Sequence, residues 1–278
     1  NMGGAVSCSR IDEDLAGEVD VRKLVMVCKS RSVKKQSVGA VGIYNVLCGS
    51  SEEFRNEYFD DRSIYVICSL LSSRSSEVSE TAYRILVELS RTPKCRNRMI
   101  EEPAWKLIFE AVSRDNMSVR LYALDIILCL CDTQEASARI LDKKNANSLI
   151  ELCFLPASDH RAQGVAITTK SLQILLAATR RHTLPAPFVD ACLTPVFRIL
   201  HSSITTIVHK ALAAALLAAM CEDSAYHVSV AAAMGNTGLQ RIVALTSFTN
   251  DDMGAHAATA VSRIAASQKL VPSLVSVG

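Results

Sequence analysis

The amino-terminal residues match the pattern of a covalent modification. Residues 2–7 (Met-Gly-Gly-Ala-Val-Ser) fit the signal M-G-x-x-x-[ST] for N-myristoylation at Gly3, and Cys8 beside it is a candidate for palmitoylation. A single myristoyl chain holds a protein on a membrane only marginally, so the second acyl chain would supply stable anchoring. Asn1 leaves two alternatives open. If Met2 is the native start, the sequence predicts a lipid anchor; if Asn1 belongs to a longer chain, the match is accidental.

The ten cysteines do not form a recognisable metal or redox motif. There is no Cys-x-x-Cys pair, and Cys129-x-Cys131 has neither a second pair nor a histidine at metal-ligand spacing. We therefore expect small buried hydrophobic side chains in a reducing cytosol, with no metal and no cofactor. Eight of them occupy apolar positions of expected helices: Cys28, Cys48, Cys68, Cys129, Cys131, Cys153, Cys192 and Cys221.

The six histidines give no support to catalysis, because they are scattered along the chain without an obvious nucleophile beside them. The sequence also contains no glycine-rich phosphate loop and no nucleophile elbow. We therefore expect a protein that is not an enzyme. The histidines are His160, His182, His201, His209, His227 and His256.

Composition bounds the class of protein further. Hydrophobic residues make up 49% and charged residues 21%, which is enough to build a continuous core, and the formal net charge of +2 is too small to indicate nucleic-acid binding. The most apolar run, Ala211 to Cys221, is about half the roughly 20 residues needed to cross a bilayer. We expect it to be a buried helix.

Such helices are indicated by a pattern that returns six times, at intervals of roughly 40–48 residues. In each copy, mostly apolar residues stand at offsets 0, +3, +4 and +7, which is one face of an α-helix. A period of this length is typical of stacked helical repeats that bury their apolar faces against one another. The residues at offset 0 are Ala40, Ala82, Ala123, Ser171, Ala211 and Ala257.

Between these long helices the sequence predicts two shorter ones in each interval. Ser50 and Asp132 stand three residues before a glutamate, which is the pattern of a helix-capping box. A short helix is expected at Phe188–Cys192, followed by a second helix with Pro195 in its first turn. Gly235 and Gly238 are expected to bracket a turn.

One interval is longer than the others. It contains Pro156-Ala157-Ser158-Asp159-His160-Arg161, which we interpret as a loop inserted in a turn.

This order of a short helix, a second helix and a long third helix resembles the armadillo repeat. The segment Ala191–Ser203 is similar to an armadillo second helix, and Glu80–Leu89 to a third helix. The resemblance covers roughly Asp20 to Ser267 and implies an all-α, right-handed α-solenoid of about six three-helix repeats, with the related HEAT repeat as the alternative. We expect an extension at 1–17, a repeat domain at 18–267 and a cap or further repeat at 268–278.

The resemblance also implies a binding surface, because third helices of armadillo proteins line a concave groove that holds peptides or helices of partners. Offsets −2, −1, +2 and +6 lie away from the buried face and should point to that groove. The early part is mixed in charge and the later part basic, which favours an acidic partner segment. The alternative is an ordinary solvated helix face. The predicted protein-binding residues are Arg84, Glu88, Asp125, Lys170, Gln173, His209, Lys210, His256 and Arg263.

The sequence departs from one armadillo class in particular. Nuclear-import receptors place Trp at +2 and Asn at +6 to clamp basic peptides, whereas Trp105, the sole tryptophan, lies on an expected second helix and should be core. This argues against recognition of nuclear localisation signals. Offset +2 is instead occupied by Gly42, Arg84, Asp125, Gln173, Ala213 and Thr259.

Two functional hypotheses follow. The first is a cytoplasmic interaction scaffold or adaptor, either soluble or lipid-tethered on the cytosolic face of a membrane like the small armadillo-only adaptors. The second is a substrate-recognition or autoregulatory module of a larger enzyme such as a ubiquitin ligase. The start and stop codons of the full-length gene would separate them.

Overall fold

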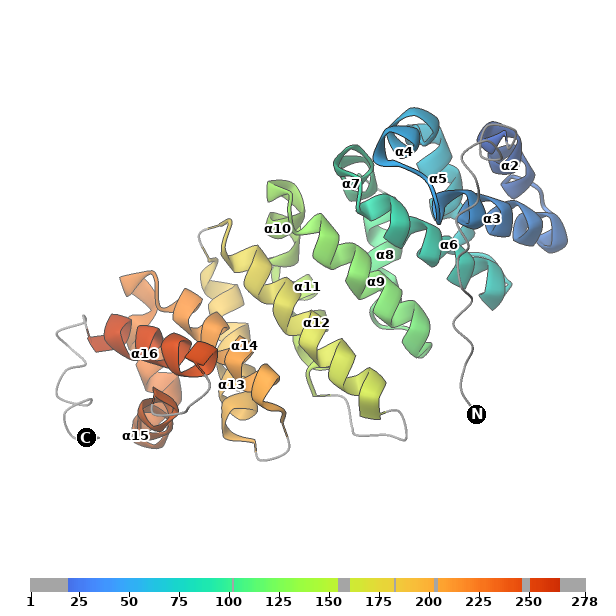
Figure 1. Cartoon of the computed structure of the whole chain (residues 1–278). Coiled ribbons are helices and arrows are strands. Elements are labelled where there is room, and N and C mark those ends of the chain that lie inside the picture. Colours follow the sequence, from blue (N-terminus) through green and yellow to red (C-terminus); the bar gives the residue numbers. More distant parts are fainter. Residues whose placement is uncertain are drawn as a thin grey trace. The chain divides into compact units, whose positions relative to one another are not determined.

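The computed structural model describes residues 20–101, 103–154, 161–182, 184–202, 205–246 and 251–265. These residues form helices joined by short turns, and no strand occurs among them, which confirms the all-α prediction (Figure 1). None of the described helices combines the length and the apolarity that a membrane-crossing helix needs. Gly3, Cys8 and residues 156–160 of the expected loop lie outside the described residues.

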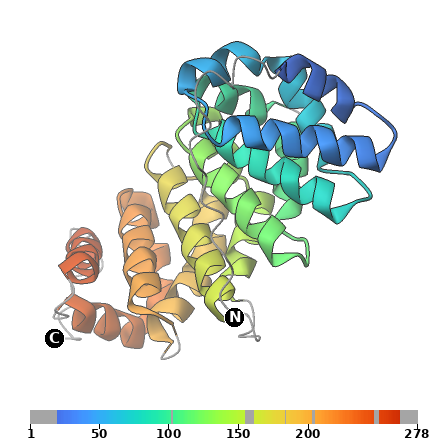
Figure 2. The ribbon, with the colours of Figure 1, turned by 45° about the vertical axis from the view of Figure 1, so that its right-hand side comes forward.

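The chain divides into two compact units, and unit 1 ends at Leu130. Its long helices α3, α6 and α9 pack against one another in sequence order and lie side by side, with the shorter helices on their other side (Figure 2). They are the expected third helices of three successive repeats, of which the first contains two described helices. The helices are α2 (Val21–Cys28), α3 (Val33–Leu47), α4 (Glu52–Tyr58), α5 (Asp61–Leu70), α6 (Ser76–Ser90), α7 (Pro93–Ile100), α8 (Ala104–Ala111) and α9 (Met117–Leu130).

Unit 2 begins at Cys131. Its first repeat has the same order of a short, a second and a long helix, whereas the single helix α13 precedes α14, and η1 with α15 precedes α16. Its third helices are α12, α14 and α16, with α14 packed between the other two. The unit contains α10 (Gln134–Ile140), α11 (Lys143–Leu152), α12 (Arg161–Thr179), α13 (Ala186–His201), α14 (Ile207–Met220), a short 3-10 helix η1 (Ser224–Tyr226), α15 (His227–Thr246) and α16 (Asp251–Ala265).

The predicted starts of two short helices are one residue too early. The hydroxyl of Ser51, not Ser50, accepts the backbone N–H of Phe54 at 3.2 Å and caps α4. Ser50 instead donates its hydroxyl to the carbonyl of Leu47 at 3.1 Å, which satisfies the end of α3. Likewise Thr133, rather than Asp132, caps α10. The capping pattern therefore located the right turns, but not which of two adjacent polar residues faces the helix.

The expected break at Pro195 is wrong, because α13 continues through it from Ala186 to His201. Proline cannot donate to the carbonyl of Ala191 and costs a helix about 3 kcal/mol. Both residues are partly exposed, so water can reach the freed carbonyl. Apolar side chains on both sides of the proline, among them Cys192 and Val196, are buried and offset that cost.

The turn expected between Gly235 and Gly238 is also wrong, because both residues lie within α15. Glycine inside a helix costs about 1 kcal/mol relative to alanine. Helix α15 packs against α13 and α16, so tertiary contacts keep the segment helical where local propensity would end it.

The predicted buried face of the third helices is confirmed. In α6, Ala82, Ile85, Leu86 and Leu89 at offsets 0, +3, +4 and +7 are all fully buried. Trp105 on α8 is also buried, as expected for a core residue.

Gly39 and Gly42 let the first two helices approach each other closely. A Cβ atom at Gly39 would lie 2.7 Å from the Sγ of Cys28 and 3.0 Å from the carbonyl oxygen of Leu24. At Gly42 it would lie 2.8 Å from a methyl group of Leu24. Larger side chains at either position would push α2 away from α3.

Candidate protein-binding surface

We use the offset +2 and +6 residues of the third helices to define the candidate surface. Arg84 on α6 is exposed and Glu88 is half-buried, as predicted. On α14 the prediction is wrong, because Ala213 and Leu217 at these offsets are buried. Helices α3, α6 and α9 present this surface in unit 1, and α12, α14 and α16 present it in unit 2. We call it the third-helix face of each unit. The two faces differ in how their charges are used.

On the third-helix face of unit 1, Arg84 is held by its neighbours. Its guanidinium pairs with Glu80 at 2.7 Å and donates through Nε to the hydroxyl of Tyr122 at 2.9 Å. The guanidinium carbon also lies 5.6 Å from the centre of the Tyr122 ring, within the range of a cation–π contact. Arg84 therefore joins α6 to α9, and much of its hydrogen-bonding capacity is already used.

Glu88, one turn further along α6, is also engaged within the unit. Its side chain is only 17% exposed and accepts from Arg91 at 2.7 Å, while Arg55 of α4 lies 3.7 Å away. Arg55 also donates to the backbone carbonyl of Glu88 at 3.2 Å. Asp125 on α9 is half-buried. The predicted residues of unit 1 thus include two that stabilise the packing of their own repeats.

The third-helix face of unit 2 leaves more of its charge available. Lys170 and Gln173 on α12, Lys210 on α14 and His256 on α16 are all half-buried, so each is accessible to solvent. Neither Lys210 nor His256 has a side-chain hydrogen bond or an ion pair with another described residue. Their polar groups can therefore be offered to a partner without breaking an internal contact.

His209 is not on this accessible surface, and its predicted exposure is wrong. The side chain is 4% exposed, and its Nε2 lies 3.0 Å from the hydroxyl of Thr169 and 3.2 Å from the carbonyl oxygen of Val165. Burial lowers the pKa of His209 and so favours the neutral ring. The reason for the error is geometric: offset −2 of α14 faces the preceding third helix α12 and not the open side.

Arg263 reaches the predicted surface but has internal partners. Its guanidinium donates to the carbonyl of Ala218 near the end of α14 and pairs with Glu222 at 3.0 Å. A cation at this position also interacts favourably with the carboxyl end of the helix. Arg263 therefore connects α16 to α14, and only part of its charge remains for a ligand.

A hollow of about 260 Å³ in unit 2 is lined by residues of α12, α14 and α16 and by residues just beyond the ends of α12 and α14. Three alanines of α14 line it together with Arg180, Arg263 and His256, and Glu222 is the one acidic residue among the lining. Arg180 is exposed and has no ion pair within the described part of the chain. The lining residues are Leu176, Thr179, Arg180, Ala215, Ala218, Ala219, Glu222, His256, Thr259 and Arg263.

A second hollow, of about 570 Å³, shares four of these residues and follows the carboxyl ends of α12 and α14. Arg181 and His182 line it, but both have internal partners. Arg181 pairs with Asp132 at 3.8 Å, and the Nε2 of His182 lies 2.8 Å from the carbonyl oxygen of Gln134. Arg180 lines both hollows and is exposed.

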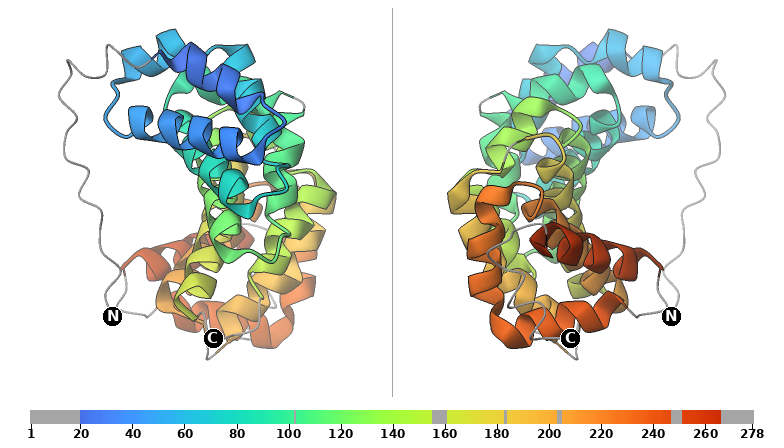
Figure 3. Two further views of the ribbon diagram at one scale, coloured as in Figure 1. Left: turned by 90° about the vertical axis from the view of Figure 1, so that its right-hand side faces the viewer. Right: turned by 90° about the vertical axis from the view of Figure 1, so that its left-hand side faces the viewer.

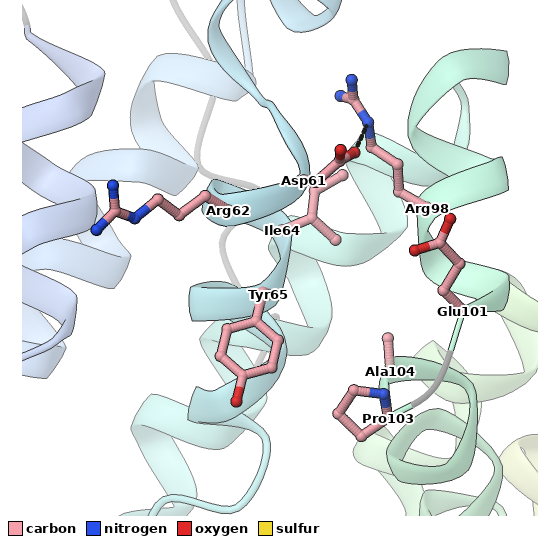
Figure 4. A pocket seen from close by; sticks show the side chains of 8 residues that line it. All are labelled: Asp61, Arg62, Ile64, Tyr65, Arg98, Glu101, Pro103 and Ala104. Carbon is pink, nitrogen blue, oxygen red and sulfur yellow. Dashed lines mark ion pairs between the residues drawn. The ribbon is translucent and has the colours of Figure 1, made fainter.

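Unit 1 has a hollow of about 360 Å³ on its shorter helices, shown in Figure 4. Arg98 of α7 pairs there with Asp61 of α5 and donates to the carbonyl of Phe59, so it ties the two helices together. Arg62 extends away from this pair, while Tyr65 is largely exposed beside Pro103. We assign the ion pair at this site a structural role.

The cysteines behave as core residues in the described part of the chain. Cys68 and Cys221 are buried, and burial raises the pKa of each to about 12. Cys153 is half-buried by its exposed area, yet burial of its thiol raises its pKa to about 12 as well. Within these residues, no three histidine, cysteine or acidic side chains are grouped so that they could hold a metal ion.

No family model matches the chain, and no curated protein matches it. Among solved structures, a computationally designed armadillo repeat protein for modular peptide recognition aligns with a TM-score of 0.72 at 14% identity, over 88% of this chain and 99% of its own. A designed armadillo repeat protein in complex with the peptide (KR)4 aligns with a TM-score of 0.71 at 13% identity, over 88% of this chain and all of its own. The fold is of the armadillo type.

An engineered protein of the same comparison reaches a TM-score of 0.73 at 20% identity and covers 94% of this chain, which spans 62% of that protein. The sequence frame did not include Arg180, which follows the last residue of α12 and stands at offset +9, although offset +9 lies on the same side as +2. It also missed Tyr122, which stands at offset −1 but is aromatic and not charged.

Proposed function

We propose that this protein is a non-enzymatic interaction scaffold that binds an acidic segment of a partner protein on the third-helix face of unit 2. The observation that carries the proposal is the hollow among α12, α14 and α16, where three alanines lie beside the exposed Arg180. Ala215, Ala218 and Ala219 leave room for a peptide backbone or a helix to approach closely. Arg180 and Lys210 would then attract carboxylates of that segment.

The armadillo fold supports this proposal, because two of the similar solved structures are described as peptide-recognising proteins. One of those peptides, (KR)4, is basic. On unit 2, by contrast, the solvent-accessible Lys210 and Arg180 are positively charged. We therefore propose an acidic ligand, and expect basic peptides to be excluded by like-charge repulsion.

An array of immobilised peptides, with acidic, neutral and basic sets of equal length, tests the proposal directly. We expect the protein to bind acidic peptides selectively, with affinity that falls as salt rises. Lys170→Glu with Lys210→Glu should abolish that binding, and thermal melting of the variant checks that it remains folded.

The matched control is Lys143→Glu with Lys144→Glu on α11, where both lysines are exposed and the change in net charge is the same. The control should bind as the unmodified protein does. If the control loses binding and the variant on the third-helix face retains it, the ligand lies on the α11 side and the proposal is wrong.

We also propose that the scaffold is tethered to a membrane through acylation of Gly3 and Cys8. The support is the sequence signal at residues 2–8. A chain beginning at Met2 should incorporate a myristate analogue in cells, and Gly3→Ala should move it from membranes to the cytosol. Cys8→Ser should weaken membrane retention without preventing myristoylation. Absence of incorporation would remove the tether from the proposal and leave peptide binding unaffected.

A further inference from the structure

Positive charge is concentrated on the first two helices of unit 1 and the turn between them. Residues 20–47 contain six cations and one carboxylate, a net charge of +5, while the whole chain carries only +2. The remainder of the chain is therefore net negative at −3. All six cations are exposed: Arg22, Lys23, Lys29, Arg31, Lys34 and Lys35. We call this the α2–α3 surface.

These charges are nearly free of internal partners. Lys23 lies 3.5 Å from Asp20, but its side chain is 85% exposed, so water and salt screen the pair. The other five cations form no ion pair with any described residue. Arg84 and Arg91 on α6 differ, since each pairs with a glutamate of its own helix. The field of the α2–α3 surface is therefore directed at solvent.

Apolar side chains are exposed among these cations. Met26 is 62% exposed and Val38 is 61% exposed, and Val33 and Val41 are also exposed. The left view of Figure 3 looks onto α2 and α3, which lie side by side at the front. Tyr83 occupies the same repeat position on α6 as Val41 does on α3, and Tyr83 is fully buried. Within the described residues, nothing covers these apolar side chains of the α2–α3 surface.

We propose that the α2–α3 surface docks on an anionic phospholipid bilayer. Cations near such a surface each strengthen binding about fivefold, and six of them lie within one short segment. The exposed Met26, Val33 and Val38 would enter the boundary between headgroups and acyl chains, where apolar side chains are favoured. A nucleic acid would satisfy the cations but would leave these apolar side chains in water, so a bilayer fits both features.

The proposal stands apart from peptide binding on unit 2 and does not require acylation. If Gly3 is myristoylated, the α2–α3 surface would be the second membrane-binding signal, because one acyl chain together with a polybasic patch suffices for stable anchoring. The signal ends at Ser7, thirteen residues before Asp20.

Co-sedimentation of the full, unacylated chain with vesicles is the decisive experiment. We expect binding to vesicles of phosphatidylcholine with about a third phosphatidylserine, little binding to phosphatidylcholine alone, and loss of binding as salt rises. Lys34→Glu with Lys35→Glu should lower the partition coefficient about a hundredfold or more, because four units of charge change. Lys143→Glu with Lys144→Glu on α11 is the matched control and should bind normally.

The apolar residues separate a bilayer from other polyanions. Met26→Ser with Val38→Ser keeps every charge and replaces two exposed side chains, so the fold should be unchanged. We expect this variant to bind phosphatidylserine vesicles several-fold more weakly and heparin equally well. Absence of vesicle binding at low salt, or an equal loss in the α11 control, would overturn the proposal. Stronger binding to an acidic peptide than to vesicles, lost in Lys34→Glu with Lys35→Glu, would overturn it in favour of a protein partner.

Discussion

The third-helix faces of units 1 and 2 are built on the same repeat but use their charges in opposite ways. In unit 1, Arg84 and Glu88 are bound to neighbouring side chains that join successive helices. In unit 2, Lys210 and Arg180 have no ion pair within the described residues, and Arg180 lines the hollow among α12, α14 and α16. The difference teaches that charge on a repeat surface indicates binding only where the protein has not already used it.

Reversing two positive charges on one face at a time should have the largest effect on peptide binding. Arg180→Glu with Lys210→Glu in unit 2 should weaken binding of an acidic peptide about a hundredfold and leave the melting temperature almost unchanged. Arg84→Glu with Arg91→Glu in unit 1 should lower the melting temperature and leave peptide binding almost unchanged, since the new carboxylates lie beside Glu80 and Glu88. Peptide titration and thermal melting of both variants check this. Equal effects of the two variants on binding would show that the faces do not differ.

Removing one charged side chain from each unit should show how much each charge contributes to the free energy of unfolding. Glu88→Ala leaves Arg55 and Arg91 without their shared partner, and we expect it to lower the free energy of unfolding by about 1–2 kcal/mol. Lys210→Ala removes a charge that has no such partner and should change it by less than about 0.5 kcal/mol. Urea denaturation measures both. A larger loss for Lys210→Ala would mean that unit 2 also depends on its surface charge.

The pH dependence of stability should involve His209 of unit 2. Because burial lowers its pKa in the folded protein, the unfolded chain binds a proton more readily there. Stability is therefore complete above the unfolded pKa of about 6.5 and is lost as pH falls below it towards the folded value. His209→Gln should flatten melting temperature against pH between about 7 and 5. An unchanged slope in this variant would assign the effect to other groups.

The reactivity of buried thiols should differ least between the two units. Cys68 in unit 1 and Cys192 in unit 2 are buried, and burial raises the pKa of both. We expect both to react slowly with a thiol reagent at pH 8 until the protein unfolds, and reductant to leave the melting temperature unchanged. Cys48 and Cys129 are half-buried and should react first. Rapid reaction of Cys68 or Cys192 in the native protein would contradict the core assignment.

Features that follow from the period of the repeat could be predicted from the sequence, whereas features that depend on contacts between helices could not. The apolar frame that contains Ala82 and Leu89 identifies the buried face of a third helix, because burial alone decides those positions. His209 occupies a polar offset, and only the packing of α12 against α14 shows that it is buried. The pair of Glu88 with Arg91 has the i,i+3 spacing that a sequence shows, but Arg55, Ala218 and Glu222 come to Glu88 and Arg263 from distant parts of the chain, and no local pattern reveals them. Pro195 and Gly235 show that packing also overrides local helix breakers.

The missing side chain at Gly39 bears on how the cations of α2 and α3 are presented. Because α2 rests directly on the backbone of α3 at this point, the two helices cannot slide apart without losing contacts around Cys28. The charges of the two helices therefore keep a fixed spacing before any ligand arrives. A preorganised array loses less conformational entropy on binding than the same cations on a flexible tail would. A polybasic tail must be ordered at the moment of contact, whereas this first layer acts as a rigid template of charge.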